Sequence, residues 1–348
     1  MRGTRLSMQT ILDNTWMDLT VIEPSLDSCW LVSNPISGKC FNVNGQTLIE
    51  LLLDDAHDRS QEAAELERLL RVTGIVPAES VAWTEDHEHW WKRGWHPSLE
   101  YYLWSRQVDY IDIGKNPRSR RSKKLIEYER QAAVPKPFQW KGSDLHLPEP
   151  LVLLGDESGG DVITNRRTVR KFRKQELGAE IASSVLWYAF NSIRENRLSA
   201  AKAGKLGLLQ SFGVAYHVGI AVFDVTDISE GIYGYDIAAH KLIRISSGSY
   251  RERVSRILMR QPAPNSANVT VFLIADYPVY FWRYRHARAL RNLYIEAGRI
   301  AQSIIVAAEA FGLKAFPTPA IKDGLAASLL NIDESRLNAI HSVSIGLE

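Results

Sequence analysis

The sequence is short of cysteine, of long apolar runs and of net charge, and each shortage excludes a class of protein. Cys29 and Cys40 are the only cysteines in 348 residues, too few for a disulfide framework or a thiolate metal site, so we expect a reducing cytoplasm. No run approaches the roughly 20 apolar residues of a membrane span, and the N-terminus lacks the apolar core of a secretory signal. A net charge of +2 requires no nucleic acid partner.

The histidines do not form a metal-binding pattern either. His87 and His89 lie in an acidic run, and His96 follows a few residues later. Two histidines separated by one residue are not a ligand set without further spacing support. We therefore predict no metal site.

What is present is a chain long enough for two units, because one domain per roughly 100–200 residues is usual. Changes in composition and periodicity along the chain predict three parts: residues 1–82 as a small domain, 83–160 as a connector, and 161–348 as a larger domain. In the first part, short strands precede helices. The strands are expected at Leu19–Ile22, Trp30–Val32 and Cys40–Val43, and the helices at Gln46–Leu53 and, behind the N-cap Ser60, at Gln61–Val72.

The last part mixes helices with apolar strands. Helices are expected at Glu180–Asn191 and Ala287–Phe311, and strands at Val214–Phe223, Gly231–Asp236, Leu242–Ser246, Val269–Ala275 and His341–Ile345. The second and third of these strands form a hairpin. The mixture predicts an α+β sandwich, in which helices flank a central sheet.

The connector combines an aromatic cluster with the basic run Lys115–Lys124, and several prolines after this run favour an extended chain that lies across the larger domain. A run of cations attracts an acidic peptide, or it is a mobile solvated loop. The sequence alone leaves both interpretations open.

The strongest local signal is a cluster of arginines. Arg166, Arg167 and Arg170 lie within five residues, together with Thr168. A guanidinium group presents a fork of donors that matches a phosphate, and a hydroxyl adds another donor. The segment is therefore either a phosphate site or a solvated basic loop.

Two further segments contain small residues at informative positions. Gln210–His217 runs into an apolar strand, and its small residues let the backbone approach a flat ligand. In Ile295–Gln302, Gly298 and Gln302 are four residues apart and share one helix face. Tight helix packing is the alternative to a ligand site for this second segment.

Together and in this order, these segments resemble the nitroreductase superfamily, and more narrowly its SagB-type peptide dehydrogenases. Members of that group carry an Arg-Arg-Ser-x-Arg segment, a Pro-Ser-x-Gly-x-x-Tyr segment, a Gly-x-Tyr-x-Tyr-Asp strand and a Glu-Ala-Gly-His-x-x-Gln helix. The counterparts here are Arg166–Arg170, Gln210–Tyr216, Gly231–Asp236 and Glu296–Gln302. The resemblance covers roughly residues 165–345 and implies a nitroreductase-like fold, bound FMN, and a homodimer with each flavin at the subunit interface.

The resemblance also assigns roles to single residues. The implied cofactor-binding residues are Arg166, Arg167, Thr168 and Arg170 for the FMN phosphate and ribityl chain, Ser211 and Gly213 for the flavin ring, and Gln302. In azoline-oxidising members a Lys-Tyr pair before the long helix is implicated in catalysis, and Arg283–Tyr284 stands there. Arginine cannot be deprotonated in a protein, so Arg283 is a poor general base. Tyr284 can do acid/base work if neighbouring cations such as Arg285 lower its pKa.

Two other parts of the chain complete the comparison with the family. The glycine-rich turn that follows the long helix in members is replaced here by a turn at Ala315–Ala320 that lacks glycine.

Residues 1–82 resemble, in pattern but without a diagnostic motif, the winged-helix PqqD-like modules that bind leader peptides as an added strand. A small packing domain without a partner is the alternative. The resemblance further implies a precursor peptide as substrate and a complex with a cyclodehydratase.

We therefore predict an FMN-dependent oxidoreductase that dehydrogenates thiazoline or oxazoline rings to azoles in a ribosomally made peptide. Hydride would leave the ring carbon for the flavin while Tyr284 takes the neighbouring proton. One alternative is a flavin-dependent reductase of dehydroamino acids, or another redox step on a peptide, which would require NAD(P)H. Another is a flavin-free, leader-binding scaffold of a peptide-modifying complex, which would be colourless.

Overall fold

The computed structural model describes residues 21–24, 29–34, 39–52, 60–72, 89–90, 93–106, 116–153, 159–202, 204 and 213–348. Its contacts divide the chain into two compact units, residues 1–110 with 286–288, and residues 111–285 with 289–348. The predicted connector 83–160 contributes residues to both units. Within the described ranges, no helix has the length and apolar character to cross a bilayer.

The smaller unit has a three-stranded antiparallel sheet in which β2 lies between β1 and β3. Its described elements are β1 (Val21–Pro24), β2 (Cys29–Asn34), β3 (Lys39–Asn44), α1 (Gly45–Leu52), α2 (Gln61–Val72) and α4 (His96–Arg106). Ser60 caps α2 as predicted, because its Oγ accepts a hydrogen bond from the Ala63 amide at 3.2 Å. The strands predicted around Trp30 and Cys40, and both predicted helices, are confirmed.

The larger unit is built on a seven-stranded sheet with the strand order β4-β7-β6-β5-β8-β10-β9, in which neighbours run antiparallel. The strands are β4 (Ser143–His146), β5 (Tyr216–Val222), β6 (Gly231–Asp236), β7 (Lys241–Ser247), β8 (Val269–Asp276), β9 (Lys314–Thr318) and β10 (Leu337–Gly346). The predicted hairpin is formed by β6 and β7.

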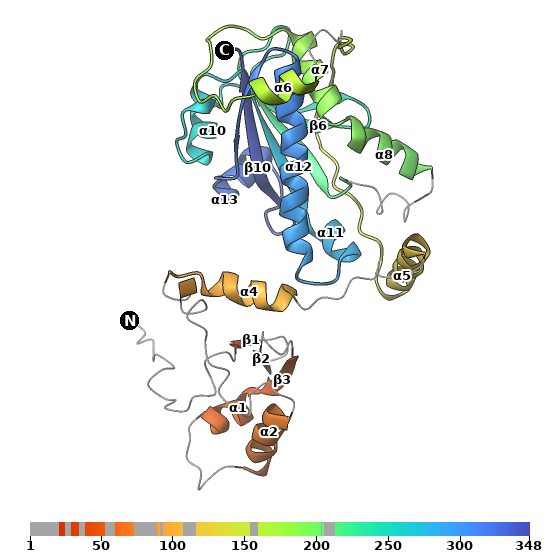
Figure 1. Ribbon diagram of the computed structural model, residues 1–348, viewed down its shortest axis with the longest axis vertical. Coiled ribbons are helices and arrows are strands. Elements are labelled where there is room, and N and C mark those ends of the chain that lie inside the picture. Colours follow the sequence, from red (N-terminus) through yellow and green to blue (C-terminus); the bar gives the residue numbers. More distant parts are fainter. Residues whose placement is uncertain are drawn as a thin grey trace. The chain divides into compact units, whose positions relative to one another are not determined.

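Helices cover both faces of this sheet, as Figure 1 shows. They are α5 (Pro117–Gln131), α6 (Gly159–Asn165), α7 (Ala179–Ala189), α8 (Asn191–Ala201), α10 (Arg251–Ile257), α11 (Tyr277–Arg283), α12 (Ala289–Ala310) and α13 (Asp323–Leu330), with a 3-10 turn at Ala263–Asn265. Apolar residues of α7 and α12 form one core with the sheet, and those of α10 and α13 form a second core on the opposite face. The α+β sandwich is therefore confirmed for this part of the chain.

The central elements follow from their sequence patterns. All eight residues of β8 are buried, as expected for an unbroken apolar run in the middle of a sheet covered on both faces. The long helix α12 buries Leu293, Ala297, Ile300 and Ile304, which recur at helical spacing. It ends before Gly312, whose φ of 72° continues the chain in the left-handed region.

The expected turn at Ala315–Ala320 is wrong for its first four residues, because β9 extends to Thr318. Proline normally disfavours a strand, since it has no amide hydrogen to donate. β9 is the edge strand of the sheet and β10 is its one neighbour among the named strands, so Pro317 is tolerated there. The position of a strand in the sheet, which the local sequence does not contain, decides this case.

The loop interpretation of Lys115–Lys124 is also wrong from Pro117 onward, where α5 begins. Proline at the first helical position favours the start of a helix. Leu125 is only 2% exposed and Tyr128 packs against the core, so apolar burial holds the basic segment in helical form. The attraction of this helix for an acidic peptide stays a prediction.

Candidate active site

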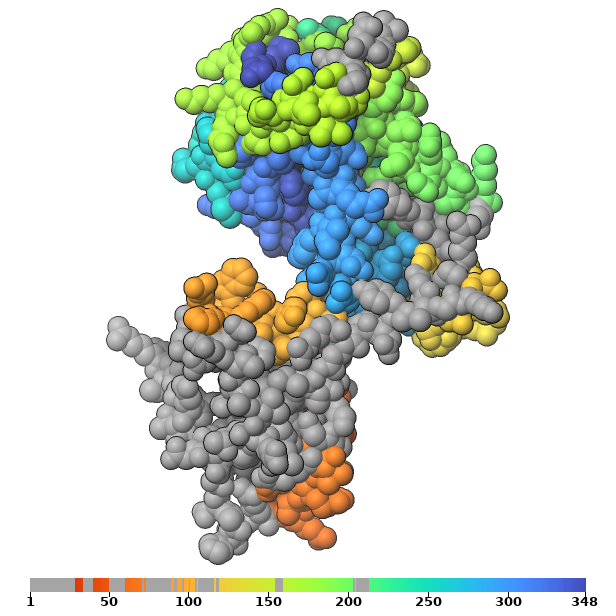
Figure 2. All heavy atoms as spheres, in the orientation of Figure 1, coloured from red at the N-terminus to blue at the C-terminus, as the bar shows by residue number. Residues whose placement is uncertain are grey.

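The arginine segment, residues Arg166–Arg170, follows α6 at the surface of the larger unit. Figure 2 shows α6 and the residues after it, in yellow-green, exposed on the same face as the dark blue C-terminus. Arg167 and Arg170 are exposed and Arg166 is half-buried. Nη1 of Arg167 donates to the carbonyl of Thr164 at 2.7 Å, which holds that guanidinium at the end of α6. Three guanidinium groups on one short surface segment suit a phosphate.

The start of β9 lies directly beside the arginine segment. Thr168 forms a parallel bridge with Ala315, and the Val169 amide donates to the Ala315 carbonyl at 3.2 Å. Cζ of Arg170 lies 5.5 Å from the ring centre of Phe316. The arginine segment and the segment that begins at Ala315 are far apart in the sequence, and they meet at the start of β9.

An open cleft of about 370 Å³ lies beyond the other end of β9. This tyrosine cleft is lined by Tyr277, Tyr294, Ala297, Pro319, Ile321, Asp323, Asn338, Ala339, Ile340 and His341. From Ala315 to Pro319 the chain advances about 13 Å at the usual rise of a strand. β9 thus connects a cationic end with a cleft whose described lining includes one carboxylate and no lysine or arginine.

Two residues in the lining of the tyrosine cleft have buried polar atoms that sequence analysis did not identify. Oδ1 of Asn338 and Nδ1 of His341 make no hydrogen bond with any residue in the described ranges. Burial lowers the pKa of His341, so its imidazole is neutral at pH 7. Buried polar groups are nearly always paired in native proteins, so these two atoms, which are covered by their neighbours and do not face the open cleft, mark a place for an ordered water.

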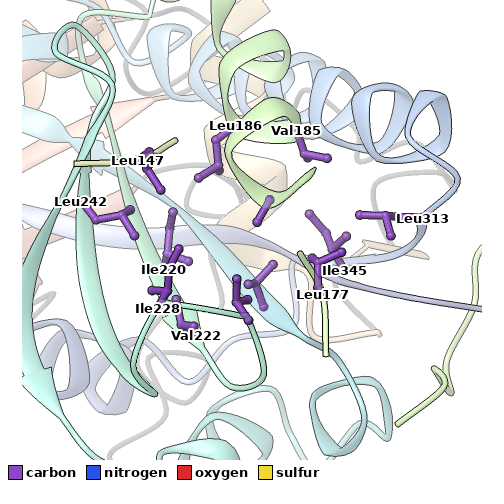
Figure 3. Close-up of a pocket in the computed structure, with 13 residues that line it drawn as sticks. Leu147, Leu177, Val185, Leu186, Ile220, Val222, Ile228, Leu242, Leu313 and Ile345 are labelled. Carbon is purple, nitrogen blue, oxygen red and sulfur yellow. The ribbon is translucent and has the colours of Figure 1, made fainter. Parts of the chain in front are cut away.

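A second cavity, drawn in Figure 3, is not a candidate site. It lies in the core between α7 and the sheet, and all 13 residues that line it are apolar. Its volume of about 20 Å³ holds roughly one sphere the size of a water molecule. The cavity is a local packing defect, far too small for a cofactor or a peptide.

Arg283 and Tyr284 lie at the C-terminal end of α11. Cζ of Arg283 is 4.7 Å from the ring centre of Tyr284, and the ring of Tyr280 is 4.8 Å from it. Arg285 lies instead over the ring of Tyr128 in α5, at 3.9 Å. Arg283 therefore faces Tyr284, and Arg285 links α5 to the end of α11.

Glu296 of α12 belongs to the same cluster, although sequence analysis gave it no role. Tyr216, Tyr280 and Arg283 lie close enough to influence its carboxyl group. Burial raises the pKa of Glu296, and the cations of Arg283 and Arg299 oppose this to a smaller extent. Burial also raises the pKa of Tyr280, so its phenol stays protonated. The cluster combines a carboxyl group, phenols and an arginine in a partly dry environment.

The arginine segment and the Arg283–Tyr284 pair lie at opposite ends of α12. Figure 1 shows α6 beside one end of this helix and α11 beside the other. A helix of 22 residues is about 33 Å long. One chain by itself therefore does not bring the predicted phosphate site and the predicted catalytic pair together.

The helix α11 is fixed by a buried carboxylate at its N-terminus. Asp276 has no exposed surface, and it accepts hydrogen bonds from the amides of Val279 and Phe138, both at 3.3 Å, and from Nη2 of Arg336 at 3.1 Å. Nε2 of His217 lies 3.5 Å away. Burial favours a raised pKa for Asp276, but the contacts with His217 and Arg336 outweigh it and lower the pKa. Tyr277 of the tyrosine cleft is thus set in place by a charged cap.

Gly213 lies in a tight turn before β5, and Ser211 lies outside the described residues. Gly213 has a φ of 75°, and a Cβ atom there would lie 2.7 Å from Ile193. Its carbonyl accepts a hydrogen bond from Nη2 of Arg197 at 2.8 Å. Burial lowers the pKa of Arg197 to about 10, which leaves the guanidinium charged at pH 7. The positive φ and the contact with Ile193 together require glycine at this position.

Gln302 and Gly298 lie on the exposed face of α12, as their spacing predicts. Ala297 and Ala301 face the core instead. A Cβ atom at Gly298 would meet nothing within 4 Å in the described part of the chain. Packing inside the described chain therefore does not account for a glycine in the middle of this helix.

Comparison with known proteins identifies relatives of this chain. A family model described as the nitroreductase family matches residues 163–346. The trifolitoxin operon protein TfxC of Rhizobium leguminosarum bv. trifolii is 26% identical over 285 residues, which cover 76% of this chain and 76% of TfxC. A solved structure from Anabaena variabilis, named as a nitroreductase, has a TM-score of 0.50 at 19% identity and covers 59% of this chain and 42% of its own. A chain of the E. coli microcin synthetase McbBCD complex with truncated pro-MccB17 bound has a TM-score of 0.41 at 14% identity, covering 70% of this chain and 85% of its own.

Proposed function

This chain belongs to the nitroreductase family, since the family match covers more than half of it, and on that premise we propose that it is an FMN-dependent oxidoreductase acting on a ribosomally made peptide. The reaction proposed is the dehydrogenation of a thiazoline or oxazoline ring to the azole. The similarity to TfxC, a protein named for the trifolitoxin operon, supports a role in making a natural product. The observation that carries the proposal is the bridge between the arginine segment and β9, which leads to the tyrosine cleft.

The residues present fit FMN. Arg166, Arg167, Thr168 and Arg170 would hold the phosphate and ribityl chain, because they offer charged and hydroxyl donors on one exposed segment. Gly213 would contact the flavin ring only through its backbone, since its missing Cβ faces Ile193, and Gln302 lies exposed on α12. The tyrosine cleft, whose described lining has one carboxylate, would lie beside the flavin ring and away from the phosphate group.

When bound, FMN supplies the acceptor for the two electrons that leave the substrate ring. The protein must then remove one proton from the neighbouring carbon. We assign this step to the phenol oxygen of Tyr284, because the guanidinium of Arg283, 4.7 Å from its ring, favours negative charge on that side chain. The carboxyl of Glu296 lies in the same cluster and can share the proton with the phenols around it.

A homodimer would complete this site. The arginine segment and Tyr284 lie at opposite ends of α12, a helix about 33 Å long, so a second copy would be needed to set one opposite the other. Twofold symmetry applies the same surface of both copies, and the exposed face of α12 around Gly298 allows a close approach. Tyr294 and Ile295, which are 50% and 55% exposed, add apolar area beside that glycine.

The smaller unit would bind the leader of the precursor peptide. Its three-stranded antiparallel sheet carries helices that follow in the chain, an arrangement that can accept a peptide as an added strand. A cyclodehydratase would supply the azoline ring, since that ring must exist before it can be oxidised.

The visible absorption spectrum of the purified full-length protein tests the proposal first. A flavin spectrum, with a released chromophore whose mass is that of FMN, is the expected result. Incubation with an azoline-containing peptide in air should then lower the peptide mass by two hydrogen atoms. A requirement for NAD(P)H and a gain of two hydrogens would instead mean a reductase. A folded protein that stays colourless in excess FMN would contradict the enzyme and leave the scaffold.

A further inference from the structure

The helix α5 concentrates positive charge that the rest of the chain does not share. It has six arginine and lysine side chains against two glutamates, a net charge of +4, whereas the whole chain has +2. The remaining residues are therefore net negative. Five of the six cations precede Leu125, where they repel one another and oppose the helix dipole. Helix stability does not account for this charge pattern.

The apolar side of α5 faces the core, where Leu125 is only 2% exposed, and its charged side faces solvent. Lys123 and Arg130 are exposed, and residues seven apart lie on one face of a helix. Glu127 lies between them on that face and is already paired with Lys124, whose Nζ is 2.9 Å from its carboxylate. The exposed stripe from Lys123 to Arg130, the basic face of α5, therefore keeps a net positive charge.

The C-terminal end of α5 is joined to the end of α11, beside which it lies in Figure 1. Nη1 of Arg285 donates a hydrogen bond to Oε1 of Gln131 at 2.8 Å, and Nε1 of Trp282 donates to the carbonyl of Ala132 at 3.3 Å. Arg285 directly follows Tyr284 and is itself exposed. The basic face thus leads, through packed contacts, to the residue next to the proposed proton acceptor.

The charge and size of the basic face select an acidic peptide segment, because carboxylates pair with lysine and arginine. Between Lys123 and Gln131 the helix rises about 12 Å, which an extended peptide covers in about four residues. A membrane surface requires a free apolar side, whereas Leu125 and Tyr128 pack that side of α5 against the core. A nucleic acid requires a broad basic surface, whereas the chain outside α5 is net negative.

We infer that the basic face of α5 docks an acidic segment of the peptide substrate, and that the ring to be oxidised follows this segment toward Tyr284. The inference rests on the proposed function, because that function supplies the peptide and the ring. Docking by charge selects a class of sequence rather than a single peptide. It would add to any binding of the leader by the smaller unit.

Fluorescence anisotropy on the full-length protein tests this with two labelled peptides. One alternates glutamate with serine and the other alternates glutamine with serine, so they differ only in charge. Wild type should bind the glutamate peptide about tenfold more tightly. Lys123→Glu with Arg130→Glu should remove this preference, because two attractive charge pairs become repulsive. Raising the ionic strength from about 0.1 to about 1 M should also weaken binding, since the screening length falls from roughly 10 to 3 Å.

Arg253→Glu with Arg256→Glu is the matched control. It changes the net charge by the same amount at two exposed arginines of α10, a helix that packs on the other core, and it should bind both peptides like wild type. Glutamate is a good helix former, so both double variants should stay folded, which urea unfolding checks. The milder Lys123→Gln with Arg130→Gln should give an intermediate affinity.

Three results would overturn the inference. Equal losses in the α5 and α10 variants would mean that the peptide responds only to the net charge of the chain. Equal affinity of wild type for the two peptides would mean that charge plays no part. Tighter binding of a single-stranded oligothymidylate than of the glutamate peptide, lost in the α5 variant, would make the basic face a nucleic acid site.

Turnover of an azoline peptide flanked by glutamates separates the docking from the proposed function. The variant with Lys123→Glu and Arg130→Glu should show a higher KM and an unchanged kcat, because the docking contacts are alike in the bound substrate and the transition state. An unchanged KM would contradict the docking. If neither wild type nor the variant oxidises the ring, the proposed function fails, and the anisotropy titration still decides whether α5 binds an acidic peptide.

Discussion

The arginine segment and the tyrosine cleft lie at the two ends of β9 and differ in how they are made. The arginine segment is continuous in sequence, charged and exposed. The cleft is assembled from α11, α12, α13, β10 and the chain after β9, and its described lining has little charge. A phosphate can be anchored by one local run of donors, whereas a neutral group must be surrounded from several sides. The difference explains why only one of the two is visible in the sequence.

The largest effect should come from removing the positive charges of the arginine segment, and it should appear in the affinity for FMN. Replacing Arg166 and Arg170 together by alanine should weaken FMN binding by about 100-fold, because a hydrogen bond to a charged group is worth roughly 1.5–3 kcal/mol and 1.4 kcal/mol is a factor of ten. Quenching of flavin fluorescence in a titration measures the dissociation constant. Lys174→Ala removes an exposed cation a few residues further on and serves as the control. If the two variants lost the same FMN affinity, the segment would act only through its general positive charge and not through specific contacts with the phosphate.

The next effect should come from removing the cap of α11 at the cleft end. Asp276→Ala leaves the half-exposed Arg336 and two backbone amides without their buried acceptor, and a hydrogen bond to a charged group is worth roughly 1.5–3 kcal/mol of unfolding free energy. Urea unfolding measures this loss. Asp144→Ala removes only an exposed pair with Lys241, at 2.7 Å, and should leave the stability almost unchanged. A mild effect of Asp276→Ala would mean that α11 is held by apolar packing.

The two ends should also respond differently to acid. Burial lowers the pKa of His217 and of His341 below the unfolded value of about 6.5, so both are neutral in the folded protein at pH 7. The unfolded state therefore binds more protons at acid pH. The stability that these neutral side chains contribute is fully present above pH 6.5 and is lost as the pH falls below it.

Urea unfolding at pH 7, 6 and 5 measures this loss. One histidine changes the unfolding free energy by at most about 1.4 kcal/mol per pH unit. His341→Gln should flatten the profile, while the arginine segment, which does not titrate in this range, should keep its affinity for sulfate, an anion whose charge is also constant between these pH values. An unchanged slope in the variant would exclude His341 as a source of acid sensitivity.

The smallest effect concerns the helix between the two ends. Gly298→Ala should raise the stability of a single folded chain by roughly 0.8–1 kcal/mol, because alanine is the better helix former and the site is open. If two α12 helices cross there, the added methyl group should nevertheless weaken the dimer. Sedimentation at several concentrations separates these effects, with the exposed Ser303→Ala on the same helix as the control. A dimer of wild-type affinity would place the interface elsewhere.

Patterns with a local cause were predictable. The apolar run of β8, the spacing of buried residues in α12 and the N-cap Ser60 each depend on neighbours in the sequence, and all three appear where expected. The edge strand β9 was not predictable, because Pro317 argues against a strand until its place at the edge of the sheet is known. The helix α5 was not predicted because its sequence is mostly charged, and only a few apolar residues, such as the buried Leu125, anchor it to the core.

The sequence by itself determined the α+β sandwich, the arginine segment and the position of Tyr284 before a long helix, since each depends on residue order within a short window. The tertiary structure alone decided which of these lie together. It set Thr168 against Ala315, and it separated the arginine segment from Tyr284 by the length of α12. It also placed Asn338 and His341 in the lining of one cleft, because β10 carries a bulge of one residue between Ala339 and His341. Strand periodicity of two puts those side chains on opposite faces, and only the pairing with β8 reverses this.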